Sequence, residues 1–212
     1  VVFSEGQSKG RGRMGREWTS PKGKGVYMSL ILRPDVSPAD APKITLMSAV
    51  AVANAIRSAT HLGALIKWPN DILINNRKVC GILTEMSAEI NTVKYIVLGI
   101  GINVNTAKAD LPKEATSLKV EAGESVARVE LTQELLRELE RQYFIFKEKG
   151  FKKIIEEWKD LSHTLGEGVK IVCHDRKIEG TAVDLDSSGA LVIRMDNGFT
   201  EHITAGDVVM VR

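Results

Sequence analysis

The segment after Gly166 limits the possible folds of this chain more than any other part of the sequence. Short apolar stretches alternate there with turn residues such as Asp186–Gly189 and Asp196–Gly198. Stretches of this length, separated by such turns, are typical of antiparallel strands. Five strands at this spacing predict a small barrel. They cover residues 169–174, 177–184, 190–196, 199–203 and 208–211.

The residues before Gly166 follow a different pattern, in which amphipathic helices alternate with strands. Ser37-Pro38 is typical of a helix start, and the apolar spacing continues this helix to about Thr60. Two more helices are predicted over residues 130–149 and 151–161. The predicted fold is therefore α/β (α+β), a mixed sheet backed by helices. Its strands are expected at residues 26–33, 65–68, 72–74, 79–86 and 93–104.

The loops differ chemically along the chain. None of the six prolines follows Pro112, and six of the eighteen glycines lie between Gly6 and Gly25. Together with the change in strand pattern, this places a domain boundary near residue 165, with one domain over 1–165 and a second over 166–212. The strand pattern is already present at the first residue, so we expect further residues upstream in the natural protein.

Composition excludes several classes of protein. Hydrophobic residues make up 43% and charged residues 26%, which is ordinary for a folded domain and unlike a disordered or fibrous chain. No window approaches eighteen apolar residues, which excludes a membrane-spanning helix. A net charge of +2 is too balanced for nucleic acid as the main ligand. The two cysteines, Cys80 and Cys173, allow at most one disulfide, so we expect a cytoplasmic protein.

Residues 9–18 form a loop rich in glycine and cations, called the glycine–arginine loop below. Its sequence is Lys-Gly-Arg-Gly-Arg-Met-Gly-Arg-Glu-Trp. Three glycines let the backbone curl close to a ligand, and four cations suit phosphate or carboxylate groups. The loop leads into a strand rather than opening a helix, so it is neither a Walker loop nor a Rossmann turn. A solvated basic loop is the alternative interpretation.

Three further segments carry candidate site residues. The turn at Lys67–Asp71 displays an amide beside a carboxylate, although ordinary turns favour the same residues. Lys78 opens an apolar strand and Gly81 interrupts it, which suits a cation beside a ligand or a surface lysine beside a bulge. Residues 98–105 place two alternate glycines on one strand face, which leaves room for a flat ring or marks a sheet corner.

In this order and spacing, the segments GRGRMGREW, KWPND, RKVCGILTE and GIGINVN resemble the catalytic core of biotin protein ligases (biotin–acetyl-CoA-carboxylase ligases). The resemblance extends over essentially the whole chain and implies a class II synthetase-like catalytic domain followed by an SH3-like barrel. It implies a ligase that converts biotin and ATP, with Mg²⁺ on the triphosphate, to biotinyl-5′-AMP. Biotin then passes to one lysine of a biotin carboxyl carrier protein.

The resemblance also implies roles for individual residues. The catalytic residues would be Arg13, Lys78 and Asp71. Biotin would contact Gln7, Arg11, Gly12, Arg13, Tyr27, Lys78, Gly81, Gly99 and Ile102. The nucleotide would contact Arg13, Arg16, Trp18, Asn70, Asp71 and Asn103. No residues have the spacing of a metal site held by the protein alone.

This reaction accounts for the presence of two cations among the implied catalytic residues. A biotin carboxylate that attacks the α-phosphate brings two anions together, and Arg13 and Lys78 suit the task of offsetting their repulsion. The adenylate is itself an activated acyl group, so no nucleophilic side chain is needed. Cys80 is accordingly expected in the core.

The family also carries a Ser/Thr-Thr-Asn segment that binds the ureido end of biotin, and this chain begins after it; we expect it upstream of Val1. Two alternative functions remain at the level of sequence. One is lipoate attachment, which shares the fold and the adenylate chemistry. The other is a DNA-binding repressor, which would need a helix-turn-helix upstream. Exposed edge strands also make a homodimer plausible.

Overall fold

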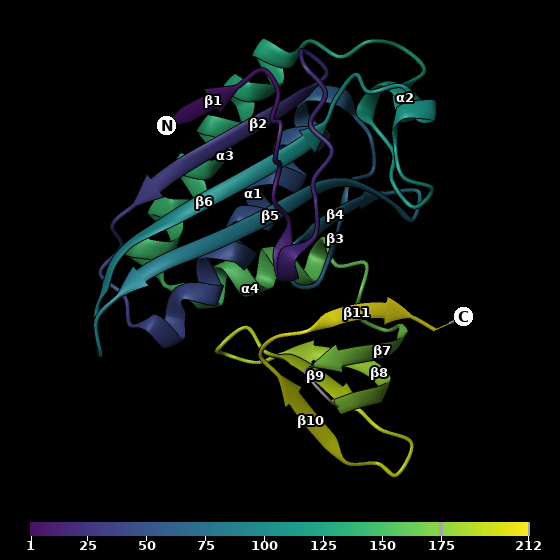
Figure 1. Cartoon of the computed structure of the whole chain (residues 1–212). Coiled ribbons are helices and arrows are strands. Elements are labelled where there is room, and N and C mark those ends of the chain that lie inside the picture. The colour runs from purple at the N-terminus through teal and green to yellow at the C-terminus, as the bar shows by residue number, and fades with distance from the viewer. Residues whose placement is uncertain (174–175, 212) are drawn as a thin grey trace.

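The computed structural model describes residues 1–173 and 176–211, so the last residue of the predicted strand 169–174 lies outside the described residues. Two sheets are present, one in each part of the chain (Figure 1). None of the helices in the described residues has the length and apolarity needed to cross a bilayer.

The larger sheet has the strand order β1-β2-β6-β5-β4-β3. Its strands are β1 (Val2–Ser4), β2 (Gly25–Leu32), β3 (Leu65–Lys67), β4 (Asp71–Ile74), β5 (Arg77–Ala88) and β6 (Val93–Asn103). Every pairing between these strands is antiparallel, which corrects the expected mixed sheet. Among the described residues, parallel geometry occurs only in two isolated bridges, Ile66–Ser162 and Lys78–Ala115. Short turns between neighbouring strands favour the antiparallel arrangement.

Helices cover one face of the larger sheet (Figure 1). They are α1 (Ala41–Thr60), α3 (Arg128–Lys149) and α4 (Phe151–Asp160), and a short α2 (Leu118–Ala122) lies near one end of the sheet. The small side chains of α1, including Ala49, Ala51 and Ala53, are fully buried, because they let the helix pack closely between the sheet and its neighbours. The predicted α/β fold with a helix-backed sheet is therefore confirmed.

None of the α-helices in the described residues lies on the opposite face of the larger sheet, and the chain after β1, which includes a short 3-10 helix at Arg13–Gly15, crosses it (purple in Figure 1). This segment contains the glycine–arginine loop. It runs towards the C-terminal part of the chain and returns to β2 (Figure 1). This face of the sheet is thus crossed by a loop rather than packed against a helix, which leaves space for a ligand between the loop and the strands.

The C-terminal sheet has the order β10-β9-β8-β7-β11. Its strands are β7 (Gly168–Cys173), β8 (Arg176–Leu185), β9 (Leu191–Arg194), β10 (Thr200–Ile203) and β11 (Asp207–Met210). All five predicted strands are present and pair antiparallel. No pairing between described residues joins β10 to β11, so the expected barrel is an open one. The turn before β9 touches the larger part of the chain, where the Trp68 indole donates to the Gly189 carbonyl at 3.3 Å.

Candidate active-site cleft

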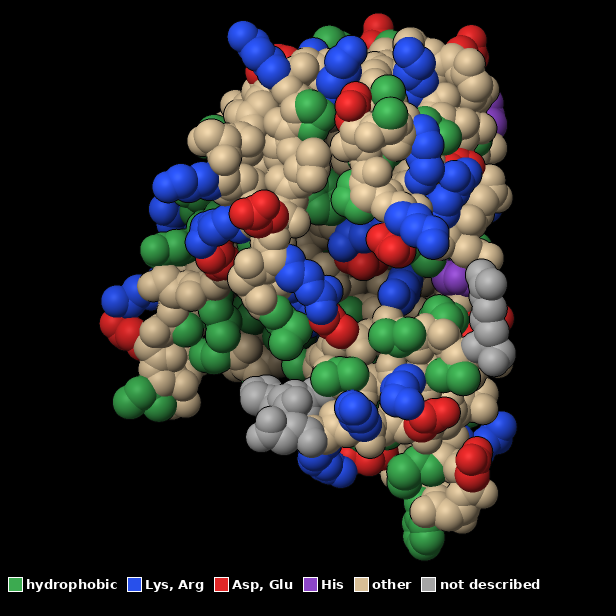
Figure 2. Space-filling model, turned by 45° about the vertical axis from the view of Figure 1, so that its right-hand side comes forward, with side chains coloured by type: hydrophobic (Ala, Val, Ile, Leu, Met, Phe, Trp, Pro, Cys, Tyr) green, Lys and Arg blue, Asp and Glu red, His purple; other side chains and the backbone are tan. Residues whose placement is uncertain are grey.

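A cleft of about 230 Å³ lies on the open face of the larger sheet. The glycine–arginine loop, β2, β5, β6 and the turn before β4 line it, and a C-terminal residue, Asp207, completes it. The face drawn in Figure 2 is hollowed, with Lys and Arg side chains beside Asp and Glu around the hollow. The cleft contains all the predicted site residues except Ile102 and Asn103: Gln7, Arg11, Gly12, Arg13, Arg16, Trp18, Tyr27, Asn70, Asp71, Lys78, Gly81 and Gly99.

Ile102 and Asn103 differ from the prediction, because neither lines the cleft. Ile102 is fully buried in the core, since side chains alternate along β6 and its neighbour Gly101 takes the cleft face. Asn103 is 3% exposed, and its Nδ2 donates to the Thr116 carbonyl at 3.1 Å. Asn103 thus anchors the segment that follows β6 rather than facing a ligand.

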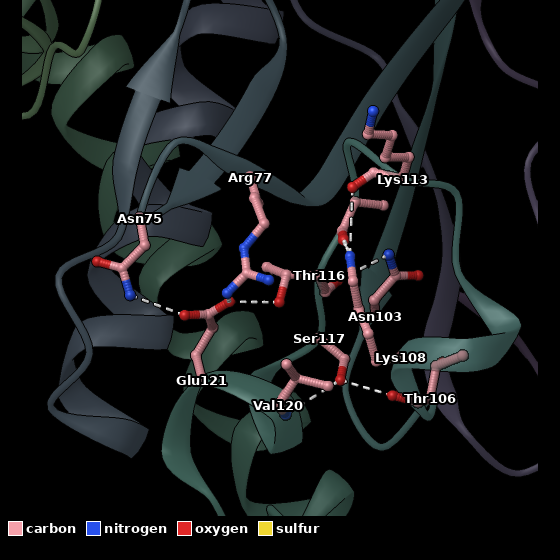
Figure 3. A network of polar contacts seen from close by, with 11 residues as sticks. Asn75, Arg77, Asn103, Thr106, Lys108, Lys113, Thr116, Ser117, Val120 and Glu121 are labelled. Atoms are coloured by element: carbon pink, nitrogen blue, oxygen red, sulfur yellow. Dashed lines mark hydrogen bonds and ion pairs between the residues drawn. The ribbon is translucent and has the colours of Figure 1, made fainter.

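That segment is fastened to the sheet by a polar network (Figure 3). The Glu121 carboxylate, whose side chain is 3% exposed, accepts hydrogen bonds at 2.7 Å from both Asn75 and Arg77. Thr116 donates a third hydrogen bond to the same carboxylate. A buried carboxylate costs little free energy when charged and polar donors surround it in this way. The network therefore holds the segment firmly beside the start of β5.

The same segment fixes the backbone of Lys78. The Lys78 amide donates to the Glu114 carbonyl at 2.9 Å, and the Lys78 carbonyl accepts from the Thr116 amide at 2.8 Å. A bulge follows directly, because Ile72 pairs with Cys80 while Leu73 pairs with Lys78, so that Val79 is the additional residue. A bulge changes which face of the sheet the next side chain points to.

This bulge explains how two residues three positions apart share the cleft. Lys78 and Gly81 would face opposite sides of a regular strand, yet both line the cleft, while Val79 and Cys80 are fully buried. Burial raises the pKa of the Cys80 thiol, so the thiol stays protonated. Cys80 is therefore a core residue, as the sequence analysis expected.

Asn70 and Asp71, which are consecutive, each contact one of the two predicted catalytic cations. Asn70 accepts from Arg13 Nη1 at 2.6 Å, while its Nδ2 donates to the Ile82 carbonyl at 2.9 Å. Asp71 Oδ1 lies 2.7 Å from Lys78 Nζ in an ion pair. The Trp-Pro-Asn-Asp turn thus brings a guanidinium and an ammonium to the same cleft.

The glycine–arginine loop is closed on itself as a small hairpin. The Gly12 amide donates to the Arg16 carbonyl at 2.7 Å, and the Trp18 amide donates to the Gly10 carbonyl at 2.9 Å. Met14, at its tip, has a left-handed backbone and is 68% exposed. The tip of the loop is therefore exposed, while Trp18 at its end packs on the sheet.

Asp207, at the start of β11, is a cleft residue that the sequence analysis missed. Its carboxylate pairs with Arg16, and its Oδ1 lies 3.9 Å from Arg13 Nη1. Arg13 Nη2 also donates to the Gly206 carbonyl at 3.4 Å. No sequence signal marks Asp207, because an acidic residue after a glycine is ordinary turn chemistry. Only the contact between the two parts of the chain reveals it.

Burial shifts the pKa of two further groups at this end of the sheet, Tyr27 and Lys67. It raises the pKa of Tyr27 to about 12, and the positive charge of Arg128 opposes part of that shift. The Tyr27 hydroxyl is therefore neutral at physiological pH, and it donates to the Pro21 carbonyl at 3.2 Å. Burial also lowers the pKa of Lys67, against the effect of the Asp71 carboxylate.

The described residues contain no group of three or more His, Cys, Asp or Glu side chains that could hold a metal ion. Among the described residues, the carboxylates that line the cleft are Glu17, Asp71, Glu85 and Asp207. Three of them are already paired with a cation: Asp71 with Lys78, Glu85 with Arg11 and Asp207 with Arg16. This donor set fits a cation that arrives with a polyphosphate and keeps most of its other ligands.

Comparison with known proteins places this geometry in a family. Residues 1–103 match the Biotin/lipoate A/B protein ligase family, and residues 164–211 match the Biotin protein ligase C terminal domain. A biotin protein ligase from Aquifex aeolicus, solved with biotin and ATP, has 32% sequence identity and a TM-score of 0.85. That alignment covers 99% of this chain and 88% of the Aquifex chain.

Two relatives show how similar this chain is to known proteins in sequence. The Bifunctional ligase/repressor BirA of Bacillus subtilis is 40% identical over 97% of this chain, which spans 64% of the length of that protein. The Biotin--[acetyl-CoA-carboxylase] ligase of Mycobacterium tuberculosis is 30% identical over 100% of this chain and 79% of that protein. The cleft, the two sheets and these similarities together show that the chain belongs to the biotin protein ligases of the biotin/lipoate A/B protein ligase family.

Proposed function

We propose that this protein is a biotin–[acetyl-CoA-carboxylase] ligase, which forms biotinyl-5′-AMP from biotin and ATP and transfers biotin to a lysine of a carrier protein. The observation that carries the proposal is the arrangement of two cations by consecutive residues. Asn70 holds Arg13 and Asp71 holds Lys78, so both cations face one cleft. A reaction between two anions needs such an arrangement.

The first step is attack of the biotin carboxylate on the α-phosphate of ATP, with pyrophosphate as the leaving group. Two like charges 4 Å apart repel by about 4 kcal/mol at an effective dielectric constant of 20. Arg13 and Lys78 offset this repulsion and stabilise the charge that develops on the phosphate oxygens. Mg²⁺, when bound to the triphosphate, neutralises further charge, and Asp71 is the residue that would contact it.

The second step is attack of the carrier lysine nitrogen on the acyl carbon, with AMP as the leaving group. The glycine–arginine loop covers the cleft, and we propose that it shields the mixed anhydride from water until the acceptor arrives. Residues 1–165 would form the catalytic domain and residues 166–212 a C-terminal domain that contributes Asp207. Gln7, Arg11, Gly12, Tyr27, Gly81 and Gly99 are proposed biotin contacts, and Arg16, Trp18, Asn70 and Asp71 are proposed nucleotide contacts.

A direct assay tests the proposal. The purified protein is incubated with ATP, Mg²⁺, either biotin or lipoate, and a carboxylase carrier domain. We expect mass spectrometry to show one biotinyl group on the carrier and none on a carrier whose acceptor lysine is replaced by arginine. Attachment of lipoate in place of biotin would contradict the proposed substrate.

We further propose a biotin carboxyl carrier protein as the partner and the cytoplasm as the location. The name of the Bacillus relative includes repressor activity, and we propose DNA binding here only if a helix-turn-helix precedes Val1. A homodimer is supported by the edge strand β1, where Val2 and Phe3 are 66% and 50% exposed. Sedimentation with and without biotinyl-AMP tests it; a monomer in both conditions would contradict it.

A further inference from the structure

Two glycines face each other across neighbouring strands on the floor of the cleft. Gly81 in β5 is the cross-strand partner of Gly101 in β6. The Trp18 indole lies directly on this pair: a Cβ added at Gly101 would lie 2.5 Å from Nε1, and one added at Gly81 would lie 3.1 Å from Cζ3. At both positions, the indole therefore occupies the space that a side chain would need.

The indole is held without a hydrogen bond from its own nitrogen. Its Nε1 is buried and finds no hydrogen-bond partner among the described residues. Lys78 Nζ lies 5.5 Å from the ring centroid, within the range of a cation–π interaction. Close packing on the two glycines and the contact with Lys78 thus contribute to the position of the ring.

Gly101 differs from Gly99, the other glycine of the same strand face. At Gly101 the three nearest atoms to an added Cβ all belong to the Trp18 indole. At Gly99 the nearest atom is the Leu83 carbonyl oxygen at 3.4 Å, which is an ordinary contact. Neither glycine has a left-handed backbone, so the chain itself would accept a side chain at both. At Gly101 the indole is the obstacle.

We propose that Gly101 is a positioning residue: it lets the Trp18 indole lie flat on the sheet and, through the indole, keeps Lys78 in place at the cleft. An alanine at this position pushes the ring outwards, into the cleft and against Lys78. The consequence for catalysis rests on the proposed function, because it requires Lys78 to act in adenylate formation. The consequence for the indole does not.

The first experiment therefore monitors the environment of the Trp18 indole directly. Protein labelled with 5-fluorotryptophan gives one ¹⁹F signal for each of Trp18, Trp68 and Trp158, and the Trp18→Leu variant assigns the first. We expect Gly101→Ala to shift the Trp18 signal and to leave the other two in place, which also shows that the fold persists. Gly99→Ala should leave all three in place. An unchanged Trp18 signal in Gly101→Ala would overturn the proposal.

The second experiment measures biotinyl-AMP formation in a double-mutant cycle. We expect Gly101→Ala to lower kcat about a hundredfold, as for a misplacement of catalytic groups by about 1 Å. In the Trp18→Leu background, which removes the obstacle, the same change should cost less than about threefold. If the losses of kcat caused by the two single substitutions multiply in the double variant, the proposal is overturned. If the unmodified protein forms no biotinyl-AMP, the proposed function fails, while the ¹⁹F spectra still decide on Gly101.

A folding failure also gives an answer. If Gly101→Ala alone does not fold, folding of the Gly101→Ala/Trp18→Leu double variant supports a clash with the indole. Failure of the double variant as well contradicts the proposal, because alanine would then meet something other than Trp18.

Discussion

The two sides of the cleft present their cations in opposite ways. Lys78 comes from β5, where backbone hydrogen bonds, a bulge and a buried ion network at Glu121 hold it. Arg13 comes from a hairpin loop whose other arginines, Arg11 and Arg16, have side chains 71% and 67% exposed. Backbone pairing holds the sheet side, whereas side-chain contacts of charged residues hold the loop side. A reaction that must both position an anion and enclose it needs a fixed side that positions the anion and a loop side that can close over it.

The largest effect is expected at the sheet side. Lys78→Ala should lower the rate of biotinyl-AMP formation by about a hundredfold or more, because it removes a charge aimed at the transition state and worth ~3 kcal/mol. The adenylate that does form should stay bound, since the loop is intact. Single-turnover assays with labelled ATP measure both quantities. Lys94→Ala, an exposed lysine paired with Glu89, is the control; near-normal synthesis by Lys78→Ala would contradict the assignment.

Arg13→Ala should also lower adenylate synthesis by about a hundredfold. Unlike the lysine variant, it should release the adenylate faster, because Arg13 joins the loop to Asn70 and to the C-terminal domain. A filter assay of released biotinyl-AMP separates the two variants, with Arg137→Ala on α3 as the arginine control. Loss of rate without faster release would mean that the loop serves chemistry alone.

Hydrogen exchange compares the two sides directly. We expect residues 8–17 to exchange about tenfold more slowly when biotinyl-AMP is bound, a gain of ~1.4 kcal/mol in local stability. Residues 8–17 contain four cations and one apolar residue, Met14, so a ligand anion provides the missing counter-charge. Residues 78–85 of β5 should change far less. Equal protection of the loop with and without ligand would show that it is preformed, and the comparison would then fail.

The smallest effect is expected at Asp207. Asp207→Asn removes the carboxylate that pairs with Arg16 and lies near Arg13. Because Arg16 is largely exposed, the loss should be ~0.5–1 kcal/mol, seen as two- to fivefold faster release of the adenylate. Glu201→Gln breaks a comparable pair with Arg176 away from the cleft and should leave release unchanged. Release from Asp207→Asn at the normal rate would exclude the C-terminal domain from loop closure.

Much of this molecule could be predicted from local sequence patterns. The helices at 41–60, 128–149 and 151–160 and all five C-terminal strands lie within a few residues of their predicted bounds. Periodicity, helix-start residues and turn residues act over distances of a few positions, which the sequence displays directly. The four segments with candidate site residues were also identified locally, from their glycines, cations and polar turn residues, while the roles of these residues came from the resemblance to biotin protein ligases.

Details of the site depend on contacts that no local pattern contains. The bulge at Val79 arises from pairing with β4, and it places Lys78 and Gly81 on one face. Ile102 and Asn103 lie outside the lining of the cleft, because sequence motifs do not state which strand face meets the cleft. The closeness of Trp18 to Gly101 likewise requires the register of β5 and β6.

Local residue patterns therefore specify which elements form and which cations are available for an anionic ligand. Folding specifies which of these residues meet: Arg13 with Asn70, Lys78 with Asp71, and the glycine–arginine loop with Asp207, about 190 residues further along the chain. The two levels differ because the interactions involved have different ranges along the chain. Local propensity acts within a turn of chain, whereas packing and ion pairing act between residues that folding alone brings together.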